Sequence, residues 1–299
     1  MIQLSHSGSR LVLAALLLIF VGGCSGLDPA RIPPIDTAGA QPMPGKVVWH
    51  DLLTEDPRAA RHFYAGLFGW TFRDVGVGRG QRYTVIEHEG RVIGGLVDAR
   101  GITRDVNVSR WIPVLSIADM DAAIAAVRAG GGTVFQAPLN IPQRGTMAVV
   151  ADPKGAVLTL LEPRDGDPAD RAAEAGDWLW NEIWSSDPEA TLAFYQSLVP
   201  AYTVERAEYG DYRALSAGGV PRVGVVQKPI DRIADTWVAY VKVSDAAATA
   251  AAAERLGGEV LLPPRVNPRG GEVAILNDPT GAGFLVQIWE PAAENNAAR

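Results

Sequence analysis

The stretch WHDLLTEDPRAARHFYAGLF, residues 49–68, occurs a second time in this chain as WNEIWSSDPEATLAFYQSLV, residues 180–199. The two stretches are offset by 131 residues. Further along, SRWIPVLSIADMDAA around Trp111 corresponds to DTWVAYVKVSDAAAT around Trp237, and the turn DPKGA at Asp152 corresponds to DPTGA at Asp278, both with an offset of 126. Because a solenoid repeat is only ~20–50 residues long, a repeat of this length indicates a duplicated domain.

Length and composition agree with two globular domains. A chain of 299 residues holds two domains of about 150 residues each. Its 47% hydrophobic and 20% charged residues are ordinary for a protein with a packed core. The net charge is −7 and Lys and Arg do not cluster, so the chain lacks the basic face that would neutralise phosphates. We therefore expect no nucleic-acid partner.

The first 23 residues have the features of a signal peptide. Arg10 precedes the apolar run LVLAALLLIFVGG, which is shorter than the ~20 residues that span a bilayer. The run ends at Val21-Gly22-Gly23-Cys24, which resembles the lipobox of bacterial lipoproteins with Val in place of the usual Leu. Cys24 is the only cysteine, so an internal disulfide is ruled out. The alternative is ordinary secretion with an incidental cysteine.

The resemblance to the lipobox implies a membrane contact through a lipid on Cys24. Ser25 after the cysteine resembles the signal for the outer membrane, which implies a location in the bacterial envelope, on the periplasmic side of that membrane. The rest of the chain divides by composition into a Pro-rich tether (24–45), a first domain (46–163), an acidic linker (164–176), a second domain (177–291) and a tail (292–299).

Each copy begins with a strand and a capped helix. VVWHDLL (47–53) and WLWNEIW (178–184) are predicted strands, and Asp56 and Asp187 are predicted helix N-caps, each followed by a proline at the first helical position. In the first copy, three short strands follow (WTFRDV, RYTVIEHE and RVIGGLVD). The pattern then restarts with WIPVLSI, the helix DMDAAIAAVRAGGG, and the strands FQAPLNI, GTMAVVAD and AVLTLLEP. The sequence thus predicts an α+β fold with two βαβββ modules per copy.

The pattern W-x-[DE]-[LI]-x-[TS]-x-D-P-x-A-x-x-x-F-Y, with the later Asp-Pro-x-Gly-Ala turn, resembles the vicinal-oxygen-chelate superfamily. That superfamily contains glyoxalase I, bleomycin- and fosfomycin-resistance proteins and extradiol dioxygenases, and this chain is most similar to its tandem two-domain glyoxalase-like members. The resemblance covers about 46–163 and 177–291. It implies a cupped mixed sheet in each domain with helices on the outer face. Because members bind or transform many unrelated molecules, it indicates the fold more than the function.

The resemblance also allows the metal-binding positions of the family to be tested. In its metal-dependent enzymes, His, Gln or Glu side chains from the first, fourth, fifth and last strands hold a divalent cation. In this chain the first-strand position carries Trp49 in the first copy and Trp180 in the second, and the fourth-strand position carries Gly94–Gly95 and Gly224. The fifth-strand position carries Trp111 or Ile112 in the first copy and Trp237 or Val238 in the second. The last-strand position carries Thr159 and Leu285, with Gln287 two residues after Leu285. Indole, glycine and aliphatic groups do not coordinate hard cations. We therefore expect no metal and no other cofactor.

The histidines are not expected to replace the missing ligands. Beyond the signal peptide only His50, His62 and His88 remain, all in the first copy. His50 alternates with Trp49 along a strand, so it should face away from the cup and toward the packed helix. His62 falls on the first helix and His88 near a hairpin tip. We expect structural or solvated roles for all three.

Aromatic and acidic residues are the candidates for ligand binding. A pair of tryptophans in a concave sheet would offer stacking area and N–H donors to a flat or cationic molecule, although such side chains can also simply fill the cup. Asp51 and Glu182 follow the first tryptophans by two residues, so they share their face. They could accept a hydrogen bond from a ligand, act as a general base, or pair with Arg82 or Arg213. The candidates are Trp49, Asp51, Trp111, Thr159, Trp180, Glu182 and Trp237, with Tyr83 and Tyr212 as weaker ones.

Three functions remain open at this point. The first is an envelope-anchored protein that binds a small organic molecule in aromatic cups. The second is a glyoxalase-type lyase or isomerase with non-standard metal ligands such as Glu87, Asp51 or Glu182, and the third is an envelope interaction protein without a ligand. Thiol catalysis and phosphate binding lack their components, because one cysteine and isolated glycine turns do not form such sites. We expect a monomer whose two copies pack together as a dimer of single domains would.

Overall fold

The computed structural model describes residues 29–35, 41–78, 81–100, 107–206, 211–267 and 270–289. The expected signal peptide, Cys24 and the tail lie outside the described residues. In the part that is described, no helix combines the length and the apolar character needed to cross a membrane.

The first copy forms one eight-stranded mixed sheet. Its strand order is β2-β3-β4-β1-β5-β8-β7-β6, and β1 and β5 pair antiparallel at the centre, which joins the two βαβββ modules. The strands are β1 (Val47–Thr54), β2 (Thr71–Gly78), β3 (Gln81–His88), β4 (Arg91–Asp98), β5 (Arg110–Ser116), β6 (Thr133–Ile141), β7 (Gly145–Ala151) and β8 (Val157–Pro163), and the helices are α2 (Pro57–Phe68) and α3 (Met120–Ala129), preceded by the short helix η1 (Pro29–Arg31).

The second copy repeats this arrangement in a second sheet. Its order is β10-β11-β12-β9-β13-β16-β15-β14, with β9 and β13 antiparallel at the centre. The strands are β9 (Trp178–Ser185), β10 (Tyr202–Arg206), β11 (Arg213–Ala217), β12 (Val220–Gln227), β13 (Thr236–Lys242), β14 (Glu259–Val266), β15 (Glu272–Asn277) and β16 (Gly283–Gln287), and the helices are α4 (Pro188–Leu198) and α5 (Ala246–Arg255). The predicted fold class is therefore confirmed, with two βαβββ modules in each copy.

The helix starts confirm the predicted caps. The carboxylate of Asp56 accepts hydrogen bonds from the amides of Arg58 and Ala59, and that of Asp187 accepts one from the amide of Ala190. Each cap precedes a proline that lacks the N–H the helix would leave unpaired. The first helix of each copy therefore begins where its Asp-Pro pair stands.

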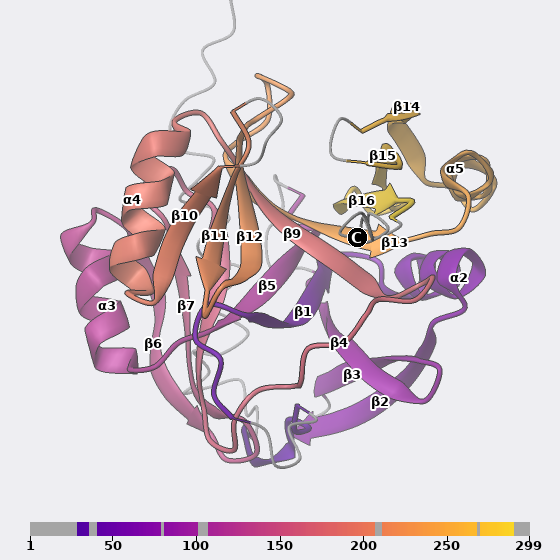
Figure 1. The fold of residues 1–299 in the computed structure, drawn as a ribbon. Coiled ribbons are helices and arrows are strands. Elements are labelled where there is room, and N and C mark those ends of the chain that lie inside the picture. Colours follow the sequence, from indigo (N-terminus) through magenta and orange to yellow (C-terminus); the bar gives the residue numbers. More distant parts are fainter. Residues whose placement is uncertain are drawn as a thin grey trace, which may run out of the picture.

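The two sheets lie back to back, with their concave sides at opposite ends of the molecule (Figure 1). Helix α3 packs beside α4 at one side, and α2 packs beside α5 at the other. One apolar cluster accordingly joins α3 and β8 of the first copy to α4 and β12 of the second, and another joins α2 and β4 to α5 and β16. We call the concave side of the β1–β8 sheet the first cup and that of the β9–β16 sheet the second cup.

An approximate two-fold axis passes between equivalent residues of the copies. The His50 imidazole donates from Nε2 to Oδ1 of Asn181 at 2.7 Å, and these residues are 131 positions apart, the same offset as the repeat. The His50 ring also stacks on Trp178 at 4.1 Å. His50 thus faces away from the first cup as expected, but it contacts the second copy rather than a helix. Burial lowers its pKa to about 4, although the hydrogen bond to Asn181 opposes that shift.

The repeated motifs mostly build the contact between the copies. Trp111 donates from Nε1 to the Tyr64 hydroxyl at 2.8 Å, and Trp237 donates to the Tyr195 hydroxyl at 2.9 Å. The Tyr195 hydroxyl in turn donates to the Asp152 carboxylate of the other copy's Asp-Pro-x-Gly turn at 3.4 Å. Burial, then the charge of Asp152, raises the pKa of Tyr195, so the phenol stays protonated. The Phe-Tyr motif and the turn are thus parts of one interface.

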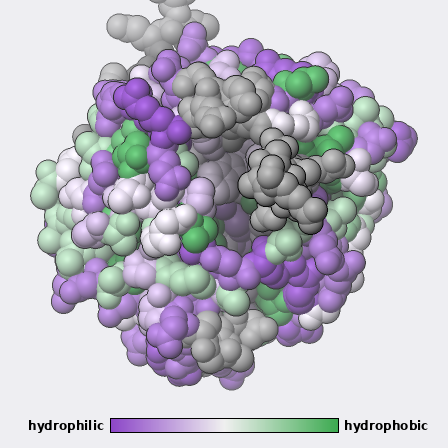
Figure 2. All heavy atoms as spheres, in the orientation of Figure 1, coloured by the Kyte–Doolittle hydropathy of each residue, from purple (hydrophilic) through white to green (hydrophobic). Residues whose placement is uncertain are grey.

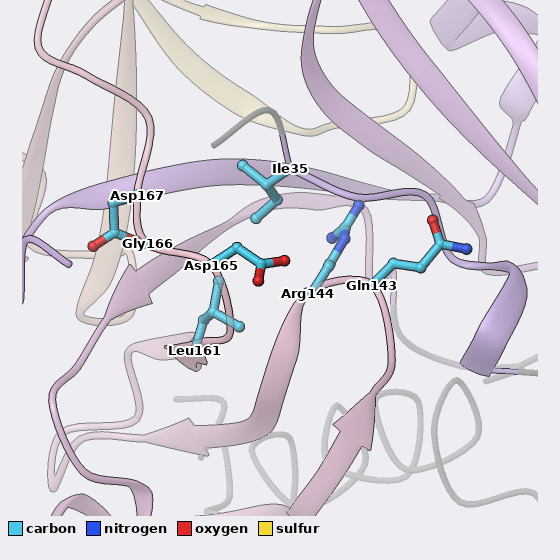
Figure 3. Close-up of a pocket in the computed structure, with 7 residues that line it drawn as sticks. All are labelled: Ile35, Gln143, Arg144, Leu161, Asp165, Gly166 and Asp167. Carbon is cyan, nitrogen blue, oxygen red and sulfur yellow. The ribbon is translucent and has the colours of Figure 1, made fainter. Parts of the chain in front are cut away.

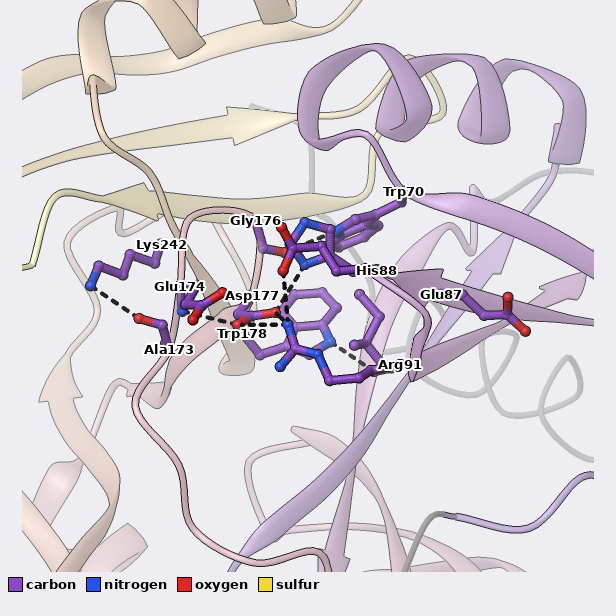
Figure 4. Close-up of polar contacts among 12 residues, drawn as sticks. Trp70, Glu87, His88, Arg91, Ala173, Glu174, Gly176, Asp177, Trp178 and Lys242 are labelled. Carbon is purple, nitrogen blue, oxygen red and sulfur yellow. Dashed lines mark hydrogen bonds and ion pairs between the residues drawn. The ribbon is translucent and has the colours of Figure 1, made fainter.

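The segment before β9 is tied to the first copy through the buried carboxylate of Asp177 (Figure 4). His88 lies 2.9 Å from it, Arg91 3.2 Å and Arg171 2.8 Å. Burial disfavours the ionised form of Asp177, but hydrogen bonds from the Glu174 amide and His88, together with Arg171, outweigh it and lower the pKa of Asp177. His88 is therefore a structural residue, and the acidic linker ends in a fixed contact between the copies.

Candidate functional site

A hydrogen-bonded triad of Trp49, Asp51 and Tyr83 lies in the first cup. The Trp49 indole donates from Nε1 to Asp51 Oδ1 and to the Tyr83 hydroxyl, both at 3.0 Å. The Tyr83 hydroxyl donates to the same Asp51 oxygen. Burial and the nearby Asp51 charge raise the pKa of Tyr83, so its hydroxyl remains a donor. The three side chains hold one another in place at the floor of the cup.

The second cup carries the equivalent residues Trp180, Glu182 and Tyr212, but their hydrogen bonds differ from those of the first cup. Trp180 donates from Nε1 to the Tyr212 hydroxyl at 2.8 Å. The Glu182 carboxylate accepts from the Tyr240 hydroxyl at 2.5 Å and from Nε1 of Trp184 at 3.0 Å. Glu182 is 2% exposed, so these donors supply what water would otherwise provide. The second cup therefore offers a fixed acid inside an aromatic lining.

A glycine on the adjacent strand makes room for each tyrosine. A Cβ atom on Gly95 would lie 1.8 Å from the Tyr83 hydroxyl and 2.3 Å from Asp51 Oδ1. A Cβ atom on Gly224 would lie 2.0 Å from the Tyr212 hydroxyl and 2.9 Å from Cγ of Glu182. These glycines hold the fourth-strand positions where related enzymes carry a metal ligand. Here they leave room for a phenol to cross the strand, and in the first cup that phenol donates to the first-strand acid.

The first cup is filled by residues 29–35 of the same chain. Ile32 and Ile35 are each 6% exposed and belong to the apolar cluster around Trp49, Tyr83 and Val85. The Arg144 guanidinium lies over the Trp49 ring, 4.4 Å from its centre. A pocket of about 230 Å³, part of it open to solvent, remains beside Ile35 and Arg144 (Figure 3).

The second cup is hollowed at the surface (Figure 2). The hollow lies over the concave side of its sheet, between β12 and β9 on one side and β15 and β16 on the other. Trp180 and Tyr212 are partly exposed here, whereas the equivalent Trp49 and Tyr83 are buried, at 2% and 8% exposure. The two cups thus carry equivalent residues on the same strands but differ in their hydrogen bonds and in their access to solvent.

The expectation that Trp111 and Trp237 share the cups with Trp49 and Trp180 is wrong. Residues directly opposite in a sheet point to the same face. Trp111 is opposite Leu52 and Trp237 is opposite Ile183, and both partners face the helices. The residues opposite Trp49 and Trp180 are Val114 and Tyr240. Val114 and Tyr240 therefore take the cup places that the sequence assigned to tryptophans.

The structure places the other predicted residues, Thr159 and Arg213, at different locations. Thr159 is buried opposite Val114 on the first-cup side. Arg213 pairs with Glu189 rather than with Glu182, and the side chain of Arg82 lies outside the described ones. The sequence reasoning missed Arg144, Trp184 and Tyr240. Trp184 could have been found from the strand alternation, because it is two residues after Glu182 on the same strand, whereas Tyr240 is placed by its pairing with Trp180. Arg144 stands in a turn and carries no periodic signal.

The residues at the family's metal positions do not form a donor set for a divalent cation. Asp51 and Glu182 already accept hydrogen bonds from indole and phenol groups. The neighbouring strand positions carry Gly95 and Gly224, whose missing side chains leave space that tyrosines fill. Glu87, a third candidate, pairs with Arg73 on the exposed side of the β2–β3 hairpin. Among the described residues, no group of three His, Cys, Asp or Glu side chains converges on one point.

Comparison with known proteins agrees with this architecture. The family model for a glyoxalase-like domain matches residues 47–161. CFP32 of Mycobacterium tuberculosis, a glyoxylase candidate, is 34% identical over 241 residues, which are 80% of this chain and 92% of that protein. The anthracycline biosynthesis protein DnrV of Streptomyces peucetius is 29% identical over 85% of this chain and 98% of its own.

Solved structures share the fold at low identity. The Mn(II)-bound glyoxalase of Novosphingobium aromaticivorans has a TM-score of 0.56 and 16% identity, and covers 83% of this chain and 84% of its own. The 2,3-dioxygenase LapB of Pseudomonas sp. KL28 has a TM-score of 0.56 and 10% identity, with 87% and 97% covered. With two tandem cupped sheets and a relative of this similarity along most of its length, the chain belongs to the glyoxalase-like family of the vicinal-oxygen-chelate superfamily.

Proposed function

We propose that this protein binds a flat organic molecule in its second cup and does so without a metal ion. The observation that carries the proposal is the partly exposed Trp180, which lies on β9 two residues before the fixed carboxylate of Glu182. The indole ring offers a stacking face, and aromatic stacking adds ~0.5–1.5 kcal/mol beyond area burial. Glu182 can accept a hydrogen bond or offset a positive charge. The favoured ligand is therefore aromatic and carries a donor or a cation.

The relatives are consistent with this ligand class. DauV and DnrV, two Streptomyces relatives, are named for anthracycline biosynthesis, and anthracyclines contain a flat fused-ring system. Both proteins align over 85% of this chain and 98% of their own length, so both copies are included in the similarity. A planar polycyclic molecule is thus a reasonable first probe class for the second cup.

Trp180→Phe is expected to weaken binding of a flat aromatic cation three- to tenfold. The change keeps an aromatic ring but shortens the stacking surface and removes the Nε1 donor to Tyr212. Ethidium is a suitable probe, with affinity measured by isothermal titration calorimetry. The equivalent Trp49→Phe is the matched control, and we expect it to leave ethidium affinity unchanged because the first cup is filled. Equal losses in both variants, or no ethidium binding at all, would contradict the proposal.

A glyoxalase-type lyase or isomerase is the second candidate. It is favoured by the names of CFP32 and of the Mn(II)-bound structural neighbour, and it would need donors that differ from the ones that the cups present. Metal analysis of the purified protein separates the two proposals. A divalent metal at one equivalent per chain, lost in Glu182→Gln or Asp51→Asn, would support the enzyme. A protein that binds neither metal nor ligand would favour the third candidate, an interaction protein.

Lipid anchoring through Cys24 is a further part of the proposal. It rests on the lipobox-like Val21-Gly22-Gly23-Cys24. Cys24→Ala is expected to move the protein from the membrane to the soluble fraction of a bacterial host, with Ser25→Ala as the control that stays membrane-bound. Unchanged fractionation of Cys24→Ala would disprove the anchor. Gel filtration of a chain lacking residues 1–24 tests the expected monomer.

A further inference from the structure

Arg144 is a buried cation that forms no ion pair with a described carboxylate, although Asp165 and Asp167 line the same pocket (Figure 3). Its side chain is 4% exposed and lies over two aromatic rings, 4.4 Å from the centre of Trp49 and 5.6 Å from that of Tyr83. Its Nη2 lies 3.5 Å from the Tyr83 hydroxyl. Across the described parts of the chain, no carboxylate forms an ion pair with it. Because a buried charge is costly unless it is paired, such a guanidinium is suited to receive an anion.

A neutral carbonyl now takes the place of that anion. Arg144 donates from Nε to the Pro33 carbonyl oxygen at 2.7 Å, and Gln143 donates to the Ala30 carbonyl at 2.8 Å. The neighbouring Ile32 and Ile35 fill the apolar part of the cup. Residues 29–35 form no strand in either sheet, so side chains rather than a ladder of backbone hydrogen bonds hold them there. The segment thus places two apolar side chains in the cup and one carbonyl acceptor against the Arg144 guanidinium.

The second copy does not repeat this feature. Gly145 and Gly271 are equivalent positions at the offset of 126, and the residue before Gly271 is Gly270 where the first copy has Arg144. The second copy therefore has no arginine at the position equivalent to Arg144, whereas the first cup has both an acid and Arg144. A duplicated fold that differs at this position is expected to bind different ligands in its two cups.

We infer that the first cup is a second binding site, specific for an apolar carboxylate, and that residues 29–35 are its resident occupant. A carboxylate replaces the Pro33 carbonyl on Arg144, where a bidentate charged hydrogen bond is stronger than the neutral one. The apolar part of the ligand replaces Ile32 and Ile35. This site is separate from the second cup, so it does not depend on the function proposed there.

The test compares octanoate with 1-octanol in isothermal titration calorimetry of the full chain. In Ile32→Ser/Ile35→Ser we expect octanoate to bind at least tenfold more tightly than in the unmodified protein, and more tightly than octanol. Adding Arg144→Gln should abolish the preference for octanoate over octanol. Val266→Ser, at a residue that is 75% exposed, is the matched control with unmodified affinity. Equal octanoate affinity with and without the isoleucine changes would overturn the inference.

A second measurement uses the unmodified protein and does not depend on the folding of a variant. Arg31 is exposed beside the buried Ile32, so displacement of the segment should expose the bond between them to trypsin. Saturating octanoate, but not octanol, is expected to accelerate cleavage after Arg31 at least fivefold. An added peptide of sequence PARIPPI should compete with octanoate in the isoleucine variant. Cleavage at an unchanged rate in octanoate would show that the segment is a permanent part of the core.

Discussion

Gly95→Ala is expected to destabilise the protein by about 2–3 kcal/mol. The added methyl would lie 1.8 Å from the Tyr83 hydroxyl and 2.3 Å from Asp51 Oδ1, both atoms of a hydrogen-bonded triad in the floor of the first cup. Overpacking a buried site costs ~1–3 kcal/mol, and displacing Tyr83 also removes its bond to Trp49. Chemical denaturation with urea, followed by circular dichroism, measures the change in the free energy of unfolding.

Gly76→Ala in the same sheet is the matched control. No atom lies within 4 Å of the Cβ position at Gly76, so alanine adds no clash there. Since glycine in a strand is less favourable than alanine by roughly 0.5–1 kcal/mol, this change should be neutral or slightly stabilising. Gly224→Ala is expected to resemble Gly95→Ala, because its methyl would lie 2.0 Å from the Tyr212 hydroxyl. Equal effects of Gly95→Ala and Gly76→Ala would show that the glycine is not needed for the triad.

Acid is expected to weaken the contact between the copies through His50. Its folded-state pKa of about 4 is below the ordinary value of about 6.5, so the unfolded chain takes up this proton first as the pH falls. The stability contributed by neutral His50 is therefore complete above pH 6.5 and is lost between about pH 6.5 and pH 4. Linkage gives a loss of about 2 kcal/mol from this residue between pH 7 and pH 4.5.

His50→Gln isolates this contribution. Glutamine can still donate to Oδ1 of Asn181 but does not titrate, so this variant should lose about 2 kcal/mol less than the unmodified protein over that pH interval. His62→Gln is the matched control, because His62 is exposed on α2 and the unmodified pH dependence should persist. Urea unfolding at pH 7 and pH 4.5 gives both differences. Parallel pH dependence in all three proteins would exclude His50 as the titrating group.

Much of the fold could be predicted because its determinants are local and occur twice. Asp56-Pro57 and Asp187-Pro188 start the two equivalent helices through hydrogen bonds that span only two or three residues. The alternation of Trp49 and His50 placed them on opposite faces of β1, as observed. The duplication then predicted two copies of the same module, and the expectation that helices cover the outer face of each sheet was correct.

The candidate site was less predictable, because it depends on pairing between strands. Local alternation orients residues within one strand, but the face of Trp111 follows from its pairing with Leu52 on β1, more than fifty residues earlier. The role of Gly95 also depends on another strand. From the sequence, a glycine at this position indicated only that a metal ligand is missing, whereas in the structure the side chain of Tyr83 from β3 lies over Gly95.

By itself, the sequence determined that this chain has two tandem glyoxalase-like domains, where their first helices begin, and which strand carries each tryptophan–acid pair. Only the tertiary structure decided that the Phe-Tyr motif and the Asp-Pro-x-Gly turn form the contact between the copies, that Trp111 and Trp237 face the helices, and that residues 29–35 fill one cup. The physical reason is the distance along the chain between the residues that interact. Caps and alternation act over a few residues, whereas occupancy of a cup is set by contacts such as Arg144 to Pro33, 111 residues apart.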